Sequence, residues 1–289
     1  MELRRIGSRQ VGAIGLGEMP MSIEGRPDEA RSVQTIHAAL DAGMTLIDTA
    51  DAYSLGGPET GHGEVLVAKA LSSWSGDRGS VLVATKGGHI RPGDGSWTVN
   101  GDPTYLRSAA DASLRRLGVE AIGLYQYHRP DPKVRYEEPI GVLKELLDAG
   151  KVLMVGISNA NVAQIDLARS ILGEGNLASV QNQFSPFFRS SEGELEHCGK
   201  LGIAFLPYSP LGGIGNGERL RNNHPAFVSV SNDHGVSVQQ VVLAWMLAKG
   251  DHVIPIPGCS RPASARDCAQ AIDLKLSDEE LSRLDRDER

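Results

Sequence analysis

The chain has 289 residues, of which 40% are hydrophobic and only 5% aromatic, and it carries a net charge of −7. This length fits either one large α/β barrel or two ordinary domains. The 36 acidic and 29 basic residues are well mixed along the chain. Nucleic-acid binding needs a basic patch or stripe, so this composition excludes a nucleic-acid partner.

The sequence also shows no export or membrane signal. Cys198, Cys259 and Cys268 are widely spaced and form no Cys-x-x-Cys pattern, so a disulfide framework is not expected. The charged start 1–5 is not followed by the apolar region of a signal peptide. No apolar run approaches the roughly 18 residues of a membrane helix. We therefore expect a cytoplasmic protein with no membrane partner; the sequence leaves open whether it is a monomer or a homo-oligomer.

The predicted elements alternate between strand and helix. A short hairpin over 2–12, with Gly7-Ser8-Arg9 as its turn, is followed by an apolar, glycine-rich strand at 11–17. The remaining strands are predicted at 44–48, 80–85, 121–127, 152–157, 178–182, 202–207 and 252–256. Helices are predicted at 28–42, 62–73, 103–117, 138–149, 161–172, 191–200 and 236–249, with further helix starts near Pro262 and Ser277.

Eight strands, each followed by a helix, indicate a parallel sheet. Near-continuous apolar strands such as 81–84 and 203–206 are typical of a sheet covered on both faces. Eight such units in fewer than 300 residues favour an α/β fold of the closed (β/α)₈ TIM barrel type, with the hairpin at its N-terminus. No linker rich in Pro, Ser or Gly divides the chain, so one domain over 1–289 is expected.

Four polar side chains lie at the strand ends where barrel chemistry is found. Asp48 ends the second strand, Tyr53 follows it by five residues, and Lys86 and His128 follow the third and fourth strands. A neighbouring ammonium favours the phenolate, so we expect Lys86 to lower the pKa of Tyr53 and Asp48 to orient Lys86. The set suits protonation of a carbonyl oxygen by Tyr53 while hydride reaches the carbon. His128 would hydrogen-bond that oxygen or help to pass the proton.

The same residues have other interpretations. Ion-pairing side chains on adjacent strands can simply close the barrel rim, and such networks also shift pKa values. Lys86 could instead form a Schiff base with a carbonyl substrate, as in a barrel aldolase. That chemistry requires a lowered lysine pKa, whereas Asp48 would keep Lys86 charged. The eight histidines show no metal-binding spacing, so no metal is expected.

These residues, in this order, resemble the aldo-keto reductase family along nearly the whole chain. The resemblance rests on segments 48–53, Thr85-Lys86, Tyr127-His128, Val155-Gly156-Ile157-Ser158-Asn159, Gln181-Asn182-Gln183-Phe184-Ser185, Tyr208-Ser209-Pro210-Leu211-Gly212 and 256–261. It implies NADPH-dependent reduction of a small aldehyde or ketone, with Asp48, Tyr53, Lys86 and His128 as catalytic residues. A regulatory subunit that binds NADP(H) on the same fold with little turnover is the alternative, because relatives of that kind can keep the four residues.

The resemblance also implies the cofactor-binding positions. Those for the nicotinamide are Ser158, Asn159, Gln181 and Tyr208; those for the pyrophosphate are Ser209 and Leu211; those for the adenosine end are Gly258, Ser260, Arg261 and Asp267.

The adenosine end departs from the family pattern. Many members have lysine and serine where this chain has Gly258 and Cys259, arginine where it has Ser264, and asparagine where it has Cys268. Arg261 or Arg266 could hold the 2′-phosphate instead, through a bidentate contact. NADPH is therefore the expected cofactor, with NADH as an alternative.

The substrate pocket is expected between loops 18–24, 87–102 and 208–225. Met19, Met21, His89 and Trp97 are the candidates for its wall. The two methionines could equally be ordinary packing at the barrel mouth.

Overall fold

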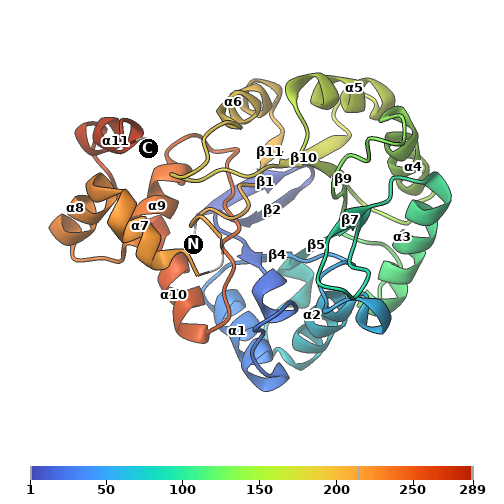
Figure 1. The fold of residues 1–289 in the computed structure, drawn as a ribbon, viewed down its shortest axis with the longest axis horizontal. Coiled ribbons are helices and arrows are strands. Elements are labelled where there is room, and N and C mark those ends of the chain that lie inside the picture. Colours follow the sequence, from blue (N-terminus) through green and yellow to red (C-terminus); the bar gives the residue numbers. More distant parts are fainter. Residues whose placement is uncertain (1, 214, 288–289) are drawn as a thin grey trace.

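The computed structural model describes residues 2–213 and 215–287, and it shows a curled parallel sheet surrounded by helices (Figure 1). An antiparallel hairpin, β1 (Leu3–Ile6) and β2 (Arg9–Gly12), comes first, as predicted. Its Ile6 and Val11 are buried in one cluster with Leu46, Leu124 and Ile254. The hairpin therefore packs against the barrel interior.

The sheet confirms the predicted barrel architecture. Within the described residues, seven parallel strands are ordered β11-β10-β9-β8-β5-β4-β3. Their bounds are β3 Leu16–Gly17, β4 Leu46–Asp48, β5 Leu82–Gly87, β8 Leu124–Tyr127, β9 Val155–Ser158, β10 Leu177–Gln181 and β11 Ala204–Phe205. Neighbours in this order are mostly consecutive in the chain, as crossover helices require. The fold is a TIM barrel.

The predicted eighth strand at 252–256 is wrong as a continuous strand, yet this segment closes the barrel. Ile254 donates its N–H to the carbonyl of Phe205 at 2.8 Å, on the β11 side. Gly15 donates to the carbonyl of Pro255 at 2.9 Å, on the β3 side. Pro255 and Pro257 have no N–H, so half of the ladder toward β3 cannot form. Toward β3, Pro255 and Pro257 therefore accept hydrogen bonds through their carbonyls but donate none.

The helices that follow the strands agree with the predicted ranges to within a few residues. They are α1 Glu29–Asp41, α2 His62–Ser73, α3 Pro103–Leu117, α4 Glu137–Asp148, α5 Val162–Leu172, α6 Glu192–Leu201, α9 Val238–Leu247, α10 Pro262–Gln270 and α11 Asp278–Asp285. Side-chain caps fix several starts: Asp28 accepts from the Arg31 N–H, and Asn161 and Ser277 form capping boxes. None of the helices in residues 2–213 and 215–287 is long and apolar enough to cross a membrane.

Two loops contain structure that the sequence did not predict. The segment after β11, expected as a long loop, contains α7 (Gly217–Asn223) and leads into α8 (Pro225–His234), and both stand with α11 on one side of the barrel (Figure 1). Ile214, within the expected loop, lies outside the described residues. Loop 87–102 contains a small antiparallel hairpin of β6 (His89–Ile90) and β7 (Thr98–Val99).

Candidate active site

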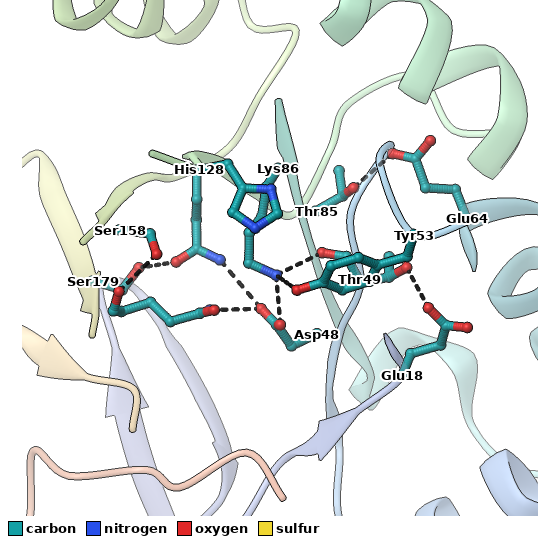
Figure 2. A network of polar contacts seen from close by, with 12 residues as sticks. Glu18, Asp48, Thr49, Tyr53, Glu64, Thr85, Lys86, His128, Ser158 and Ser179 are labelled. Carbon is teal, nitrogen blue, oxygen red and sulfur yellow. Dashed lines mark hydrogen bonds and ion pairs between the residues drawn. The ribbon is translucent and has the colours of Figure 1, made fainter. Parts of the chain in front are cut away.

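The centre of the site is a buried ammonium with three acceptors. Lys86, at the end of β5, donates hydrogen bonds from Nζ to Asp48 Oδ1 at 2.6 Å, to the Thr49 carbonyl at 2.8 Å and to Tyr53 Oη at 3.2 Å. Figure 2 shows Lys86 and Asp48 directed toward Tyr53. The Lys86 side chain is fully buried. The structure thus brings the acid, the amine and the phenol into direct contact.

Burial has the largest effect on the pKa of the Tyr53 phenol. It raises the pKa of Tyr53 to about 12, although the neighbouring charge of Lys86 acts in the opposite direction. Lys86 lowers the pKa of Tyr53, as expected, but burial outweighs this effect. The sequence showed the ammonium but not the complete desolvation of the ring, which disfavours the charged form. Tyr53 is protonated at neutral pH.

The lysine keeps its charge in spite of burial. Desolvation acts to lower the pKa of Lys86, but Asp48 and Tyr53 together outweigh it and the pKa is raised. The other carboxylate oxygen of Asp48 accepts hydrogen bonds from Gln181 at 2.7 Å and from Gln126 at 3.3 Å. Sequence reasoning missed Gln126, because a polar side chain inside an apolar strand carries no signal of its partner.

His128 follows β8 beside the phenol. Its ring lies edge-on to Tyr53, with ring centroids 5.8 Å apart, and edge-on to His89 at 4.8 Å. Burial holds the pKa of His128 well below its usual range, and the positive charge of Lys86 adds to the effect. Among the described residues His128 Nδ1 has no hydrogen-bond partner. His128 is therefore a neutral imidazole at neutral pH.

A cavity of about 880 Å³ opens over these residues. Tyr53 and His128 form part of its wall, together with Met19, His89 and Trp97. The prediction that Met21 forms part of this wall is wrong. Its side chain is fully buried in a core cluster with Ile14 and Ile36 and does not line the cavity. The preceding 3₁₀ turn at Met19–Met21 directs one methionine toward the cavity and the other inward.

The cavity continues along the positions expected for the cofactor. All ten line it: Ser158, Asn159, Gln181, Tyr208, Ser209, Leu211, Gly258, Ser260, Arg261 and Asp267. They come from the ends of β9 and β10, from the segment after β11, from the segment leading into α10 and, for Asp267, from α10 itself. Arg266, the other candidate for the 2′-phosphate, does not line the cavity.

The backbone and side chains of this wall are held in a local geometry that is common at ligand-binding sites. Tyr208 donates from Oη to Asn159 Oδ1 at 2.7 Å. Asn159 and Ser209 have φ of 58° and 50°, in the left-handed region that non-glycine residues rarely adopt and that is enriched at ligand sites. A Cβ at Gly258 would come within 2.7 Å of Pro20. Any side chain at this position would therefore force Pro20, which also lines the cavity, to move.

The end of the cavity where the adenosine was expected has two further features. Asp267 accepts hydrogen bonds from Ser237 at 2.8 Å and from Gln240 at 2.7 Å, so both of its oxygens have protein donors. Cys259 and Cys268 are buried there with their Sγ atoms 4.0 Å apart. They replace polar family residues with a small apolar contact.

The sequence also did not predict a buried carboxyl group, that of Glu18, beside the proposed catalytic residues. Glu18 is fully buried and accepts a hydrogen bond from Ser22. It also accepts one from Thr49 at 2.9 Å (Figure 2). Burial raises the pKa of Glu18 to about 7, and Asp48 adds to the rise while Lys86 opposes it. Glu18 directly follows β3, which lies in the strand predicted at 11–17, but nothing in the sequence indicated that its side chain would be buried.

Comparison with known proteins places this barrel among oxidoreductases. The model of the aldo/keto reductase family matches residues 13–288. An uncharacterised oxidoreductase of Schizosaccharomyces pombe is 33% identical over 285 residues, which cover 97% of this chain and 88% of the yeast protein.

Solved structures agree with this match. The glycerol dehydrogenase AKR11B4 from Gluconobacter oxydans superposes with a TM-score of 0.83 at 28% identity, covering 99% of this chain and 94% of that one. The thermostable aldo-keto reductase Tm1743, solved with the inhibitor epalrestat, has a TM-score of 0.81 at 27% identity and covers 99% of both chains. The fold and site define an NAD(P)H-dependent oxidoreductase. The chain belongs to the aldo/keto reductase family.

Proposed function

We propose that this enzyme reduces an aldehyde or ketone to an alcohol with NADPH, and that Tyr53 is the proton donor. The observation that carries the proposal is the contact of Tyr53 Oη with Lys86 Nζ at 3.2 Å, in the wall of the cavity that His128 also lines. A protonated phenol and a neutral imidazole on one wall provide two hydrogen-bond donors for a carbonyl oxygen.

Four residues take part in the proposed proton transfer, and each has a different role. Bound NADPH supplies the hydride that reaches the carbonyl carbon. Tyr53 gives its proton to the carbonyl oxygen as negative charge develops there, and the C–O double bond becomes a single bond. The phenolate left on Tyr53 is stabilised by Lys86, whose charge Asp48 maintains. His128 donates a hydrogen bond to the same oxygen and orients the carbonyl.

The proposed cofactor contacts follow the order of the groove. Ser158, Asn159 and Gln181 would hold the carboxamide and Tyr208 would stack on the nicotinamide ring. Ser209 and Leu211 would contact the pyrophosphate, and Gly258, Ser260 and Asp267 the adenosine. Arg261 lines this end of the cavity whereas Arg266 does not, which supports Arg261 as the partner of a 2′-phosphate and NADPH over NADH.

The geometry disfavours the Schiff-base alternative. An aldolase lysine must be uncharged and able to reach the substrate. Lys86 has a raised pKa, three hydrogen-bond acceptors and no place in the cavity lining. Its position suits a permanent charge behind Tyr53.

A substrate panel tests the proposal. Purified protein is mixed with NADPH, and separately with NADH, and a set of aliphatic and aromatic aldehydes and ketones, and cofactor oxidation is followed at 340 nm. We expect carbonyl-dependent oxidation that is faster with NADPH. NADPH binding without turnover of any panel member would refute the reductase and favour the regulatory alternative.

A further inference from the structure

Arg129 places a positive charge directly beside the proposed reaction centre. It follows His128 in the chain and lines the same cavity. Its Nη2 donates a hydrogen bond to Asn159 Oδ1 at 3.2 Å, and Asn159 in turn accepts from Tyr208. The guanidinium is therefore held at the junction of the proposed nicotinamide and substrate positions.

The charge of Arg129 has no acidic partner. In the part of the chain that the structure describes, no carboxylate lies within 4.0 Å of its guanidinium. Arg91, behind Trp97 at the same mouth, is by contrast paired with Glu24. A cation that lines a cavity without a counter-charge is available to an anionic ligand.

The acidic side chains of the cavity do not compensate it. The cavity lining contains Asp48 and Asp267. Asp48 is paired with Lys86, and Asp267 accepts hydrogen bonds from neutral side chains at the far end of the groove.

The effect of Arg129 on its neighbours shows which way its charge faces. The pKa of His89 is lowered to about 4, mainly by burial and next by Arg129. Arg129 also contributes to the lowered pKa of His128, and it opposes the burial that raises the pKa of Tyr208. All three rings border the space above Tyr53. Arg129 therefore lies close enough to these three rings for its charge to act on each of them.

We propose that Arg129 is a specificity-determining residue and that the carbonyl substrate carries an anionic group, a carboxylate or a phosphate. The inference rests on the proposed reductase function and adds the substrate class to it. A guanidinium holds either anion through two parallel N–H donors. Met19, Ile23 and Trp97 make the rest of the wall near the proposed reaction centre apolar. The other cations of the cavity lining are Arg221, in α7, and Arg261, just before α10.

Matched substrates test the inference. The kcat and KM values are measured with NADPH for benzaldehyde against 4-carboxybenzaldehyde, and for glyceraldehyde against glyceraldehyde 3-phosphate. The second member of each pair differs by an anionic group, so the two pairs distinguish carboxylate from phosphate. The proteins are the wild type, Arg129→Gln, Arg129→Lys, and Arg107→Gln as a control, because Arg107 is exposed and paired with Glu145 away from the cavity.

We expect Arg129→Gln to lower kcat/KM for at least one anionic substrate about 10- to 100-fold, mainly through KM, as loss of a charged hydrogen bond predicts. The ratio of kcat/KM for the anionic substrate to that for its uncharged partner should fall at least tenfold. Arg129→Lys should recover part of this preference, and Arg107→Gln should behave as wild type. An unchanged ratio of anionic to neutral substrate in Arg129→Gln would overturn the inference while leaving the reductase intact. A weaker NADPH Kd with an unchanged ratio would make Arg129 a cofactor residue and overturn it equally.

A calorimetric titration keeps the inference testable without turnover. If the wild type reduced no aldehyde, the proposed reductase would fail, and 4-carboxybenzaldehyde and glyceraldehyde 3-phosphate would be titrated into the NADPH complex. Binding of either that weakens at least tenfold in Arg129→Gln supports the anion site. Equal binding to both proteins, or no binding to the wild type, refutes it.

Discussion

Gln181 Nε2 donates a hydrogen bond to Asp48 Oδ2 at 2.7 Å, and this bond joins the proposed cofactor wall to the catalytic ion pair. Asp48 lies at the end of β4 and Gln181 at the end of β10, on opposite sides of the curled sheet. The carboxylate that holds Lys86 is therefore itself oriented by a residue beside the nicotinamide position. In the proposed reaction, cofactor binding and proton transfer would therefore share one hydrogen-bonded network.

Removing the phenol oxygen should abolish most of the reduction. Tyr53→Phe deletes the proposed proton donor and keeps the ring, so we expect kcat to fall about 100- to 10,000-fold with little change in NADPH Kd, as loss of a general acid predicts. Tyr136→Phe is the control, because the Tyr136 hydroxyl is buried without a partner among the described residues. Near-normal turnover of Tyr53→Phe would remove Tyr53 from the mechanism.

Breaking the central ion pair should reduce stability as well as activity. Lys86→Met leaves Asp48 buried without its countercharge, and we expect the free energy of unfolding to fall by about 3 kcal/mol. The Asp48→Asn/Lys86→Met double variant should recover much of this loss but no turnover. Urea unfolding measures both, with Lys69→Met as control for an exposed pair that contributes little. Equal stability of the single and double variants would contradict the ion-pair account.

Glu18 should make stability depend on pH near neutrality. Its pKa is raised from 4.5 to about 7 in the folded protein, so folding favours the protonated form. Stability from this group is complete below pH 4.5 and is lost as pH rises through 7. Glu18→Gln should therefore raise the free energy of unfolding by about 2–3 kcal/mol at pH 8, and much less at pH 5. Urea titrations of both proteins at the two pH values measure this; a constant difference would show that Glu18 does not titrate in this range.

Arg261 should decide cofactor preference. If it pairs with the 2′-phosphate, Arg261→Gln should weaken NADPH binding about tenfold and leave NADH binding unchanged. Arg266→Gln is the matched control, because Arg266 lies five residues further along and outside the cavity. Fluorescence titration with both cofactors gives the four Kd values. A parallel loss for NADPH and NADH would assign Arg261 to a part that the cofactors share.

The sequence predicted the features that depend on the periodicity of apolar residues and on the order of strands and helices. It did not predict those that depend on burial or on hydrogen-bond partners from distant parts of the chain. The strand ends that present Asp48, Lys86 and His128 followed from the alternation of apolar strands and helices. The eighth strand failed because Pro255 and Pro257 remove donors that the apolar pattern does not register. The net rise in the pKa of Tyr53 did not follow from the sequence, because burial is a property of the assembled barrel.

The same reason explains the residues that were missed or misplaced. Glu18 and Gln126 are fully buried and are stabilised by partners far along the chain. Met19 and Met21 share a short apolar stretch, and only the turn between them decides which lines the cavity. The helices α7 and α8 lie after a glycine-rich stretch that was interpreted as loop throughout.

The segment 252–258, the proline seam, makes fewer hydrogen bonds to β3 than a regular strand would make, because Pro255 and Pro257 have no N–H to donate. Amides that rely on this seam, such as those of Gly15 and Gly17, depend on carbonyls of Pro255 and Pro257. Native-state hydrogen exchange should detect earlier opening there than at β8, which is paired on both sides. The seam ends at Gly258, in the groove proposed for the cofactor. A bound dinucleotide would therefore contact the barrel where its first and last strand positions meet, and would stabilise this closure.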